Sequence, residues 1–516
     1  MKETPMKKRI FCVLLCFSML GTLLGCSNVD DTGNELYDEL SQYYQSSDSG
    51  KKEPVLTAFA LPYLQGLTLD PLTCLDGTQQ DIGQLLYEGL VALDQSFTPQ
   101  PVLAESWSYD AGSFTWAIRL RSGISFSDGS ALTASDVVST LQRARSVPRY
   151  QGRMAQVSSI SAAGSETVVI RLNRANASFI SLLDIPVVKT GTETNTVPTG
   201  TGRYVFVETS GTDKAHLVKN DSWWQQKALP LARIELHACK DSDTISYAFY
   251  AREVQLLWQD LTASDAASAA GSGTYTDADT TTLQYLGFNT SRAPFDNAAL
   301  RRAVSLGIDR AGCVQSFLTG HGRATQFPIS PASNLYPNDL ETGYSPDHFN
   351  QAMAALGYEA PVAVTLLVNS ENSHKVDMAG KIAAALSDSA LKVTMKVLPF
   401  DQFQSALQAG NFDLYLGECR MTADWDLTEL LSGSLNYGRY QSPEFTAALQ
   451  SERTAEGSAH EQAAAELYAL LLEQCPIAPI CFKSSTILLT PGAVDAITPT
   501  LNDPFFAMER WKVHIS

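Results

Sequence analysis

The sequence predicts an α/β protein built from more than one domain, and three observations support this prediction. The body of the chain, from about Val55 to Ser516, holds roughly 460 residues, which is too many for a single hydrophobic core. Stretches with strand and helix periodicity alternate through its second half, as expected of a sheet covered by helices. The first half is richer in strands and turns, so two or three domains are expected.

The first half of the body shows both kinds of periodicity. Apolar residues at helical spacing predict a helix in 80–94, and the alternation in 114–120 predicts a half-buried strand. In 125–145, a Ser-Asp-Gly turn leads into a helix that begins at the pair Thr133 and Asp136, a typical helix-start pattern. Strands are also expected at the start of 55–73 and in 167–172, 198–208 and 283–289.

The second half predicts a regular alternation of elements. Residues 296–310 read as a helix with Asp296 as its cap. Strands are expected in 362–368, 391–399 and 412–418, and helices in 373–389, 403–410 and 459–474. This order predicts a sheet with helices on its faces.

The N-terminus predicts an export signal. Lys7, Lys8 and Arg9 precede the apolar run 10–24, which is too short to span a bilayer comfortably. Its end, Leu23-Leu24-Gly25-Cys26, resembles a bacterial lipobox, which implies cleavage before Cys26 and a lipid on that residue. The alternative is an uncleaved signal-anchor helix. The polar, acidic stretch that follows, to residue 53, is predicted to be a flexible tether.

The net charge restricts the partners. The chain carries −18, and a leader with four cations and one anion would leave the mature chain at −21. A surface this acidic disfavours nucleic acid and anionic lipid headgroups, and it is compatible with a cationic or zwitterionic ligand.

The cysteines predict buried thiols rather than a metal or redox site. No CxxC spacing occurs, and a strand across CPIAPIC would hold Cys475 and Cys481 roughly 20 Å apart, too far for a disulfide. That bridge would need the two prolines to fold the segment into a turn. Apart from the leader and Cys26, the chain has Cys74, Cys239, Cys313, Cys419, Cys475 and Cys481.

The sequence gives little support to an enzyme. It contains no GxSxG or HExxH motif, and its seven histidines are isolated. The most prominent acidic pair is Asp424 and Asp426 in ADWD, but acids two apart on an extended segment point to opposite faces. A surface enzyme is therefore disfavoured, and no cofactor is expected.

Four stretches carry a resemblance to a known family. They are QLLYEGLVALDQSFTPQPVLAESWS, FTWAIRLRSGISFSDGSALTASDVV, PTGTGRYVFVE and YLGFNTSRAPFDNAALRRAVSLGIDR, in this order. Together they resemble the extracellular solute-binding proteins of peptide-type ABC importers, the oligopeptide- and dipeptide-binding group of family 5, in a lipoprotein form. The resemblance covers nearly the whole body, and residues 284–310 are its most specific part.

The resemblance implies a two-lobed fold of the periplasmic-binding-protein type, with an extra strand-rich domain in the first lobe, that closes on a ligand. The implied division is a lipoprotein signal peptide at 1–25, a tether at 26–53, a discontinuous lobe I at 54–75, 196–280 and 487–516, the extra domain at 76–195, and lobe II at 281–486.

The resemblance also implies a ligand anchor in lobe II. Asp424, preceded by alanine and followed by an aromatic residue, falls where peptide-binding members place an acid that pairs with the peptide's α-amino group. This chain departs from the family pattern at two points. Met421 stands near the position where peptide-binding members often have a tryptophan, and Asp426 is not followed by the proline that they usually have. The alternative for Asp424 is a loop acid, exposed or paired with Arg420; for Asp426 it is a helix cap. Ligand-binding residues are predicted at Asp424, Trp425, Arg420, Tyr285 and Asn289, with main-chain contacts from 61–67. Trp425 could equally pack in the core.

The expected function is a monomeric receptor, lipid-anchored on the outer face of the cell membrane, that delivers di- or oligopeptides to a permease driven by separate ATPase subunits. Two alternatives stay open. The same fold could bind a nickel chelate, a haem or an oligosaccharide, or the protein could sense peptides without feeding transport. The sequence does not distinguish uptake from sensing.

Overall fold

The computed structural model describes residues 57–209, 214–262, 274–387 and 391–515. The predicted signal peptide, the tether and Cys26 lie outside these residues. Within the described part, none of the helices combines the length and the apolar composition needed to cross a bilayer.

The largest sheet has seven strands in the order β11-β17-β12-β16-β14-β15, with β13 added to β17, and it forms the centre of lobe II while β11 lies at its lobe I end, where Leu256 joins the lobe I core. The strands are β11 (Leu256–Gln259), β12 (Thr274–Phe288), β13 (Gly322–Ala324), β14 (Val362–Asn369), β15 (Leu391–Leu398), β16 (Leu414–Arg420) and β17 (Ile477–Leu489). Strand β14 runs parallel to β15 and β16, whereas β12 is antiparallel to β16 and β17. The alternation predicted from the second half of the sequence therefore forms one mixed sheet.

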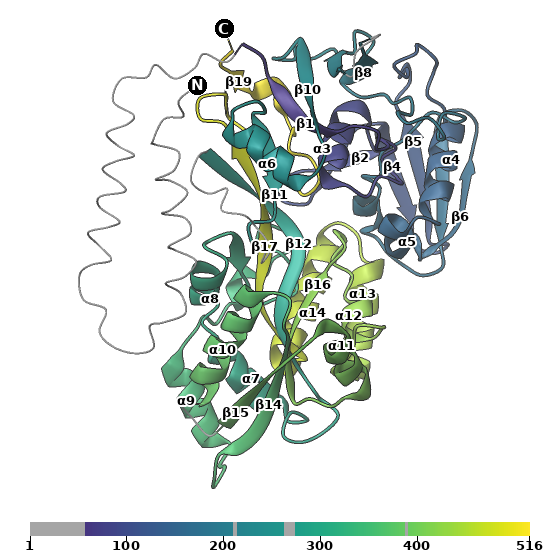
Figure 1. The fold of residues 1–516 in the computed structure, drawn as a ribbon. Helices are drawn as coiled ribbons and strands as arrows, with labels where there is room; N and C mark the ends of the chain where they lie inside the picture. The colour runs from purple at the N-terminus through teal and green to yellow at the C-terminus, as the bar shows by residue number, and fades with distance from the viewer. Residues whose placement is uncertain (1–56, 210–213, 263–273, 388–390, 516) are drawn as a thin grey trace, which may run out of the picture. The chain divides into compact units, whose positions relative to one another are not determined.

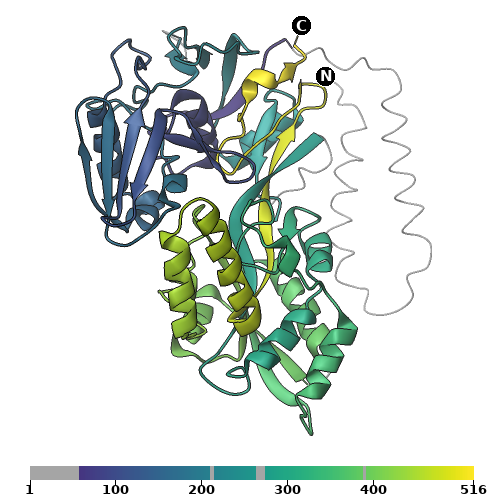
Figure 2. The same cartoon turned by 180° about the vertical axis from the view of Figure 1, so that it is seen from behind.

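Helices cover both faces of this sheet, because side chains alternate along each strand. Leu286 and Phe288 join one core with α7 (Ala298–Leu306), α8 (Arg310–Phe317), α9 (Pro346–Ala355) and α10 (Ser373–Ser387). Leu283 and Tyr285 join the other with α11 (Phe400–Ala409), α12 (Thr428–Leu431), α13 (Pro443–Thr454) and α14 (Ser458–Gln474). Helices α13 and α14, yellow-green in Figure 2, lie side by side.

Lobe I contains a four-stranded sheet with strand order β1-β10-β9-β8. Its strands are β1 (Ala60–Leu64), β8 (Tyr204–Glu208), β9 (Ala215–Lys219) and β10 (Arg233–Cys239), with helices α3 (Gly77–Leu86) and α6 (Ser242–Tyr250) beside them. The end of the chain completes its core: Phe505, Met508 and Trp511 cluster with Phe59 and Leu61. A short pair, β18 (Val494–Asp495) and β19 (Lys512–Val513), closes this part.

The extra domain has its own antiparallel sheet and core. Its strands are β4 (Ala104–Asp110), β5 (Thr115–Leu120), β6 (Val157–Ala162) and β7 (Thr167–Leu172), in the order β4-β5-β7-β6. The short pair β2 (Val91–Leu93) and β3 (Pro99–Pro101), helices α4 (Ala134–Ala144) and α5 (Pro148–Met154) and the 3-10 turn η1 (Phe179–Leu182) complete it. The predicted helix start is confirmed, since the Thr133 N–H donates to the Asp136 carboxylate at 3.0 Å.

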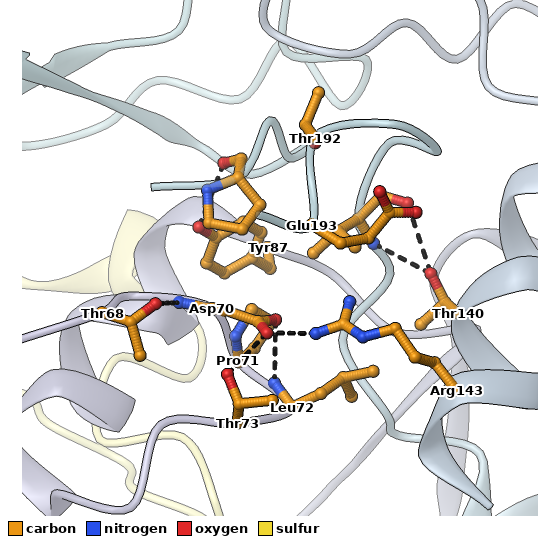
Figure 3. A network of polar contacts seen from close by, with 12 residues as sticks. Thr68, Asp70, Pro71, Leu72, Thr73, Tyr87, Thr140, Arg143, Thr192 and Glu193 are labelled. Carbon is orange, nitrogen blue, oxygen red and sulfur yellow. Dashed lines mark hydrogen bonds and ion pairs between the residues drawn. The ribbon is translucent and has the colours of Figure 1, made fainter. Parts of the chain in front are cut away.

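A buried ion pair ties this domain to the loop that follows β1. Asp70 is 2% exposed and pairs with Arg143 of α4. The same carboxylate accepts hydrogen bonds from the Thr73 hydroxyl at 2.6 Å and from the Leu72 N–H at 3.3 Å (Figure 3). The loop and the helix are thus held together by charge-assisted contacts in a buried setting.

Two long strands, β12 and β17, run from lobe I into lobe II (Figure 1). They pair from Thr274 opposite Leu489 to Gly287 opposite Ile477, with a register shift between Asp279 and Leu283. The predicted lobe limits at 280/281 and 486/487 fall within these strands. Chain connections between the lobes therefore lie side by side, which suits a hinge.

Three local predictions were wrong. The single helix expected over 296–310 is divided in two, since α7 ends at Leu306 and α8 begins at Arg310. The expected helix over 80–94 ends at Leu86, and Val91–Leu93 form β2 instead. At Gly89 the chain passes so close to Asp184 that an added Cβ would lie 2.8 Å from its backbone, which short apolar periodicity cannot reveal. The helix near 298 is capped by Asn297, not Asp296, because the Asn297 side chain accepts the Ala299 N–H at 2.9 Å.

The prediction of free thiols is confirmed for the six described cysteines. Cys475 ends α14 in a left-handed conformation, and Cys481 lies inside β17. Five of the six are buried, so they contribute to the apolar cores.

Candidate functional site

Asp424 is a buried carboxylate at the contact between lobe II and the extra domain. It is 6% exposed, and its Oδ2 accepts a hydrogen bond from Asn176 Nδ2 at 2.7 Å. Its Oδ1 is buried and has no hydrogen-bond partner. Burial, together with the nearby negative charge of Asp426, raises the pKa of Asp424, while hydrogen bonds from the side chains of Thr422 and Asn176 and the positive charge of Arg453 act in the opposite direction. This acid therefore has spare acceptor capacity in a dry position.

Asp426 is fully engaged by protein groups. Its carboxylate pairs with Arg174 of the extra domain at 2.8 Å and with Arg453 of α13. It also accepts the Thr428 N–H at 2.9 Å, at the start of α12. Asp426 thus joins the two lobes and accepts the N–H of the first residue of α12, but the cap of this helix is Leu427 and not Asp426, so the predicted alternative of a helix cap was wrong.

Trp425 packs among aromatic residues. Its ring meets Phe97 of the β2–β3 loop at 5.0 Å and Phe482 of β17 at 5.6 Å, both edge-on. The side chain is 7% exposed and belongs to the lobe II core. Its backbone φ of +53° lies in the left-handed region, which bulky residues rarely adopt, so the aromatic contacts hold a strained residue in place.

Arg420 ends strand β16 and is exposed. Among the described residues no ion pair joins it to Asp424, so the predicted alternative of an Arg420–Asp424 pair is not what the structure shows. Arg420 lies at the end of the strand that leads into ADWD, and in the described part of the chain its guanidinium forms no ion pair.

Tyr285 lies in strand β12 and Asn289 directly follows that strand, and among the described residues no hydrogen bond joins either of them to Asp424. Tyr285 sits opposite Gly417, where an added Cβ would lie 2.5 Å from its ring, and Tyr415 sits in the same way over Gly287. The Asn289 amide donates to the carbonyl oxygens of Gly410 and Phe412, both at 3.1 Å. Both predicted residues have structural contacts in this state, and their role in ligand binding stays a prediction.

The predicted main-chain contacts from 61–67 fall on β1 and the turn after it. Strand β1 is buried and pairs in parallel with β10. Gln79 Oε1 accepts the Leu64 N–H at 3.0 Å, and Leu64 accepts the Leu67 N–H at 3.3 Å. Much of this backbone is already used by the protein, so ligand contacts from it also remain a prediction.

Sequence reasoning did not find the residues of the other lobe that contact Asp424 and Asp426. Asn176 is 248 residues away from Asp424, and Arg174 is 252 residues away from Asp426. Both stand in a short polar stretch after β7 that has no motif of its own. Arg453, near the end of α13, likewise reads as an ordinary helical cation. Only the three-dimensional fold brings these residues together.

Besides a cavity of about 200 Å³ that Leu61 and Pro62 of β1 line, two cavities lie elsewhere. One of about 190 Å³ is enclosed by residues from both lobes and from the crossing strand β12, among them Phe97, Asp279 and Arg323. Another, of about 300 Å³, lies within lobe I beside Glu88, Arg203 and Asp503. Neither is lined by Asp424. In the described part of the chain, no group of three or more His, Cys, Asp or Glu residues could hold a metal ion.

Comparison with known proteins identifies the family. The sequence model of the bacterial extracellular solute-binding proteins, family 5 (middle region), matches residues 98–438. A curated relative, the glutathione-binding protein GsiB of Escherichia coli O1:K1, is 25% identical over 390 residues, which cover 71% of this chain and 75% of the relative.

Solved structures share the fold. The MppA periplasmic murein tripeptide binding protein, in an unliganded open form, aligns with a TM-score of 0.72 at 19% identity, covering 89% of this chain and 98% of that one. A nickel ABC transporter protein from Bacillus halodurans aligns with a TM-score of 0.73 at 20% identity, covering 87% and 98%. The two-lobed α/β architecture is thereby confirmed. The chain belongs to the family 5 bacterial extracellular solute-binding proteins, so it is a solute-binding component of an ABC importer and not an enzyme.

Proposed function

We propose that the protein captures di- or oligopeptides between its two lobes and delivers them to a membrane permease, while a lipid on Cys26 holds it at the outer face of the cell membrane. The observation that carries the proposal is the Asp424 carboxylate, which is buried between the lobes with Oδ1 unpaired. An unpaired buried acceptor is costly, and an ammonium group from a ligand would satisfy it.

The chemistry of a peptide suits this position. Every peptide with a free N-terminus carries one α-ammonium group, so pairing with it fixes the register without reading side chains. In a dry site such a charge-assisted pair is stronger than in water. Relatives named for binding glutathione, a murein tripeptide and a nonapeptide support a peptide ligand.

The test compares Asp424→Asn with the wild type, using free and N-acetylated versions of the same peptides. Removing one member of a buried charge pair costs roughly 2–5 kcal/mol, so Asp424→Asn should weaken free peptides by about 30-fold to several thousand-fold. Acetylated peptides should bind the wild type as poorly as free peptides bind the variant. Isothermal titration calorimetry measures both affinities, and equal binding of free and acetylated peptides by the wild type would reject the assignment.

Solved structures of the same fold in complex with nickel chelates favour one second candidate, a chelated metal as ligand. Native mass spectrometry of residues 54–516, followed by denaturation, separates the two. A ladder of peptide masses supports peptide capture, whereas a single non-peptide mass means that Asp424 binds something other than an α-amine.

A further inference from the structure

The segment 173–178 of the extra domain connects the two lobes directly. It follows β7 and precedes η1. Its Arg174 pairs with Asp426 at 2.8 Å and donates to the Thr428 hydroxyl at 3.1 Å. The Ala177 N–H donates to the carbonyl oxygen of Arg453 at 2.9 Å. This segment therefore contacts lobe II with its side chains and with its backbone.

Asn176 is the member of this segment that reaches Asp424, and its own domain fixes its orientation. Its Oδ1 accepts the Ser178 N–H at 3.0 Å, and its Nδ2 donates to Gln156 Oε1 at 3.0 Å as well as to Asp424. Its backbone carbonyl accepts the Trp116 Nε1–H at 3.3 Å. The amide nitrogen is therefore presented to lobe II at a defined position.

The two oxygens of Asp424 differ in their environment. Oδ2 receives the donor from Asn176, whereas Oδ1 receives none although it is buried. A carboxylate can accept several hydrogen bonds, so a ligand donor at Oδ1 does not have to displace Asn176 from Oδ2. Lobe contact without a ligand leaves Oδ1 without a donor, and a ligand ammonium group would supply one.

We propose that Asn176 couples ligand capture to lobe closure. It donates from the extra domain to one oxygen of Asp424 while the ligand's ammonium group donates to the other. Closure is then more favourable with an amine ligand than without one, because a ligand shifts a conformational equilibrium only through its differential interaction with the two states. Asn176 is thus a positioning residue for the ligand anchor. This inference rests on the proposed function, because it assumes that Asp424 binds an amine.

The experiment uses the mature chain with two variants and one matched control. Asn176→Ala removes the donor and the turn contact with Ser178. Asn176→Asp keeps the shape and the turn acceptor but faces Asp424 with a second carboxylate. Asn173→Ala is the control. Asn173 is exposed, and within the described residues its side-chain amide donates only to the Ala155 carbonyl oxygen of its own domain. Thermal unfolding verifies that each variant folds.

The readouts are the affinity for one tripeptide in free and N-acetylated form, and the radius of gyration in solution with and without it. One hydrogen bond to a charged group corresponds to about a 10- to 100-fold effect, so Asn176→Ala should weaken the free tripeptide by that factor. Its binding of the acetylated form should not change, and the ligand should compact it less than the wild type. Asn176→Asp should lose more, and Asn173→Ala should lose nothing.

Two results would overturn the inference in distinguishable ways. If the wild type prefers the free tripeptide and Asn176→Ala retains that preference in full, or binds more tightly, then Asn176 is a bystander or a competitor while Asp424 remains the anchor. If the wild type does not discriminate between the two forms, the amine anchor itself fails, and the coupling fails with it.

Discussion

Asp424 illustrates how the fold changes the titration of a buried acid. The folded chain binds the proton of Asp424 more tightly than the unfolded chain, because burial and Asp426 disfavour the charged form. The free energy of unfolding therefore falls as the pH rises between the ordinary pKa of an aspartate and the raised pKa in the fold. At neutral pH the ligand-free protein keeps this cost, and an ammonium partner would reduce it.

The same titration predicts a pH dependence of ligand affinity. An amine pairs only with ionised Asp424, so the affinity for a free-amine peptide should fall as the pH falls through the raised pKa. The decline should begin above the ordinary aspartate range, which centres near 3.9. Calorimetry between pH 7.5 and 4.5 measures it, with Asp424→Asn as the control that lacks this titration. A pH dependence of the wild type that matches that of Asp424→Asn would contradict the prediction.

At the scale of elements, the segment 173–178 contacts Thr428 of α12 and Arg453 of α13, and we expect this contact to influence how readily the lobes separate. The side chains of Arg174 and Asp426 are 35% and 11% exposed, so solvent weakens this ion pair only in part. Asp426 also pairs with Arg453 of its own lobe, which keeps its charge compensated when the lobes part. The contact is therefore suited to repeated opening.

Arg174→Ala should make ligand exchange faster. A partly exposed ion pair contributes at most about 1 kcal/mol, so the ligand should dissociate about two- to fivefold faster, and added salt should shrink the difference. Stopped-flow kinetics measures the dissociation rate. Arg119→Ala is the matched control, because Arg119 pairs with Glu105 at 3.1 Å inside the extra domain. Equal effects of the two substitutions would mean that the interlobe pair has no special role.

Periodicity predicted most of the elements but not the site around Asp424. The helix at α14 and the strands at β5, β7, β14 and β15 were expected within a few residues, because each carries its own pattern of buried side chains. The prediction of one helix over 80–94 was wrong because apolar residues such as Leu90 and Val91 fit the pattern of a helix as well as that of a strand. Asn176 and Arg453 could not be predicted, since their partners lie on other elements far along the chain.

At the scale of the whole molecule, a receptor that hands over its ligand has to stay near the membrane. Each buried methylene of an acyl chain contributes about 0.8 kcal/mol to membrane attachment. Cys26→Ala should therefore move the protein from the membrane fraction to the soluble fraction, as immunoblots of separated fractions would show. Cys16→Ala, which alters only the predicted leader, is the control and should remain in the membrane fraction. Retention of the Cys26→Ala protein at the membrane would indicate a signal-anchor helix.

The place of the last residues in the core of lobe I has a consequence for how the protein matures. Phe505, Met508 and Trp511 complete a core that begins with Phe59 and Leu61, whereas the sheet of lobe II is complete once β17 is present. During synthesis, lobe II can fold before the residues after β17, which complete the core of lobe I, have been made. A chain that stops short of residue 505 would carry Asp424, the proposed ligand anchor, on a finished lobe with no finished counterpart to close over it. Truncated copies would therefore be unable to compete with intact receptors for ligand.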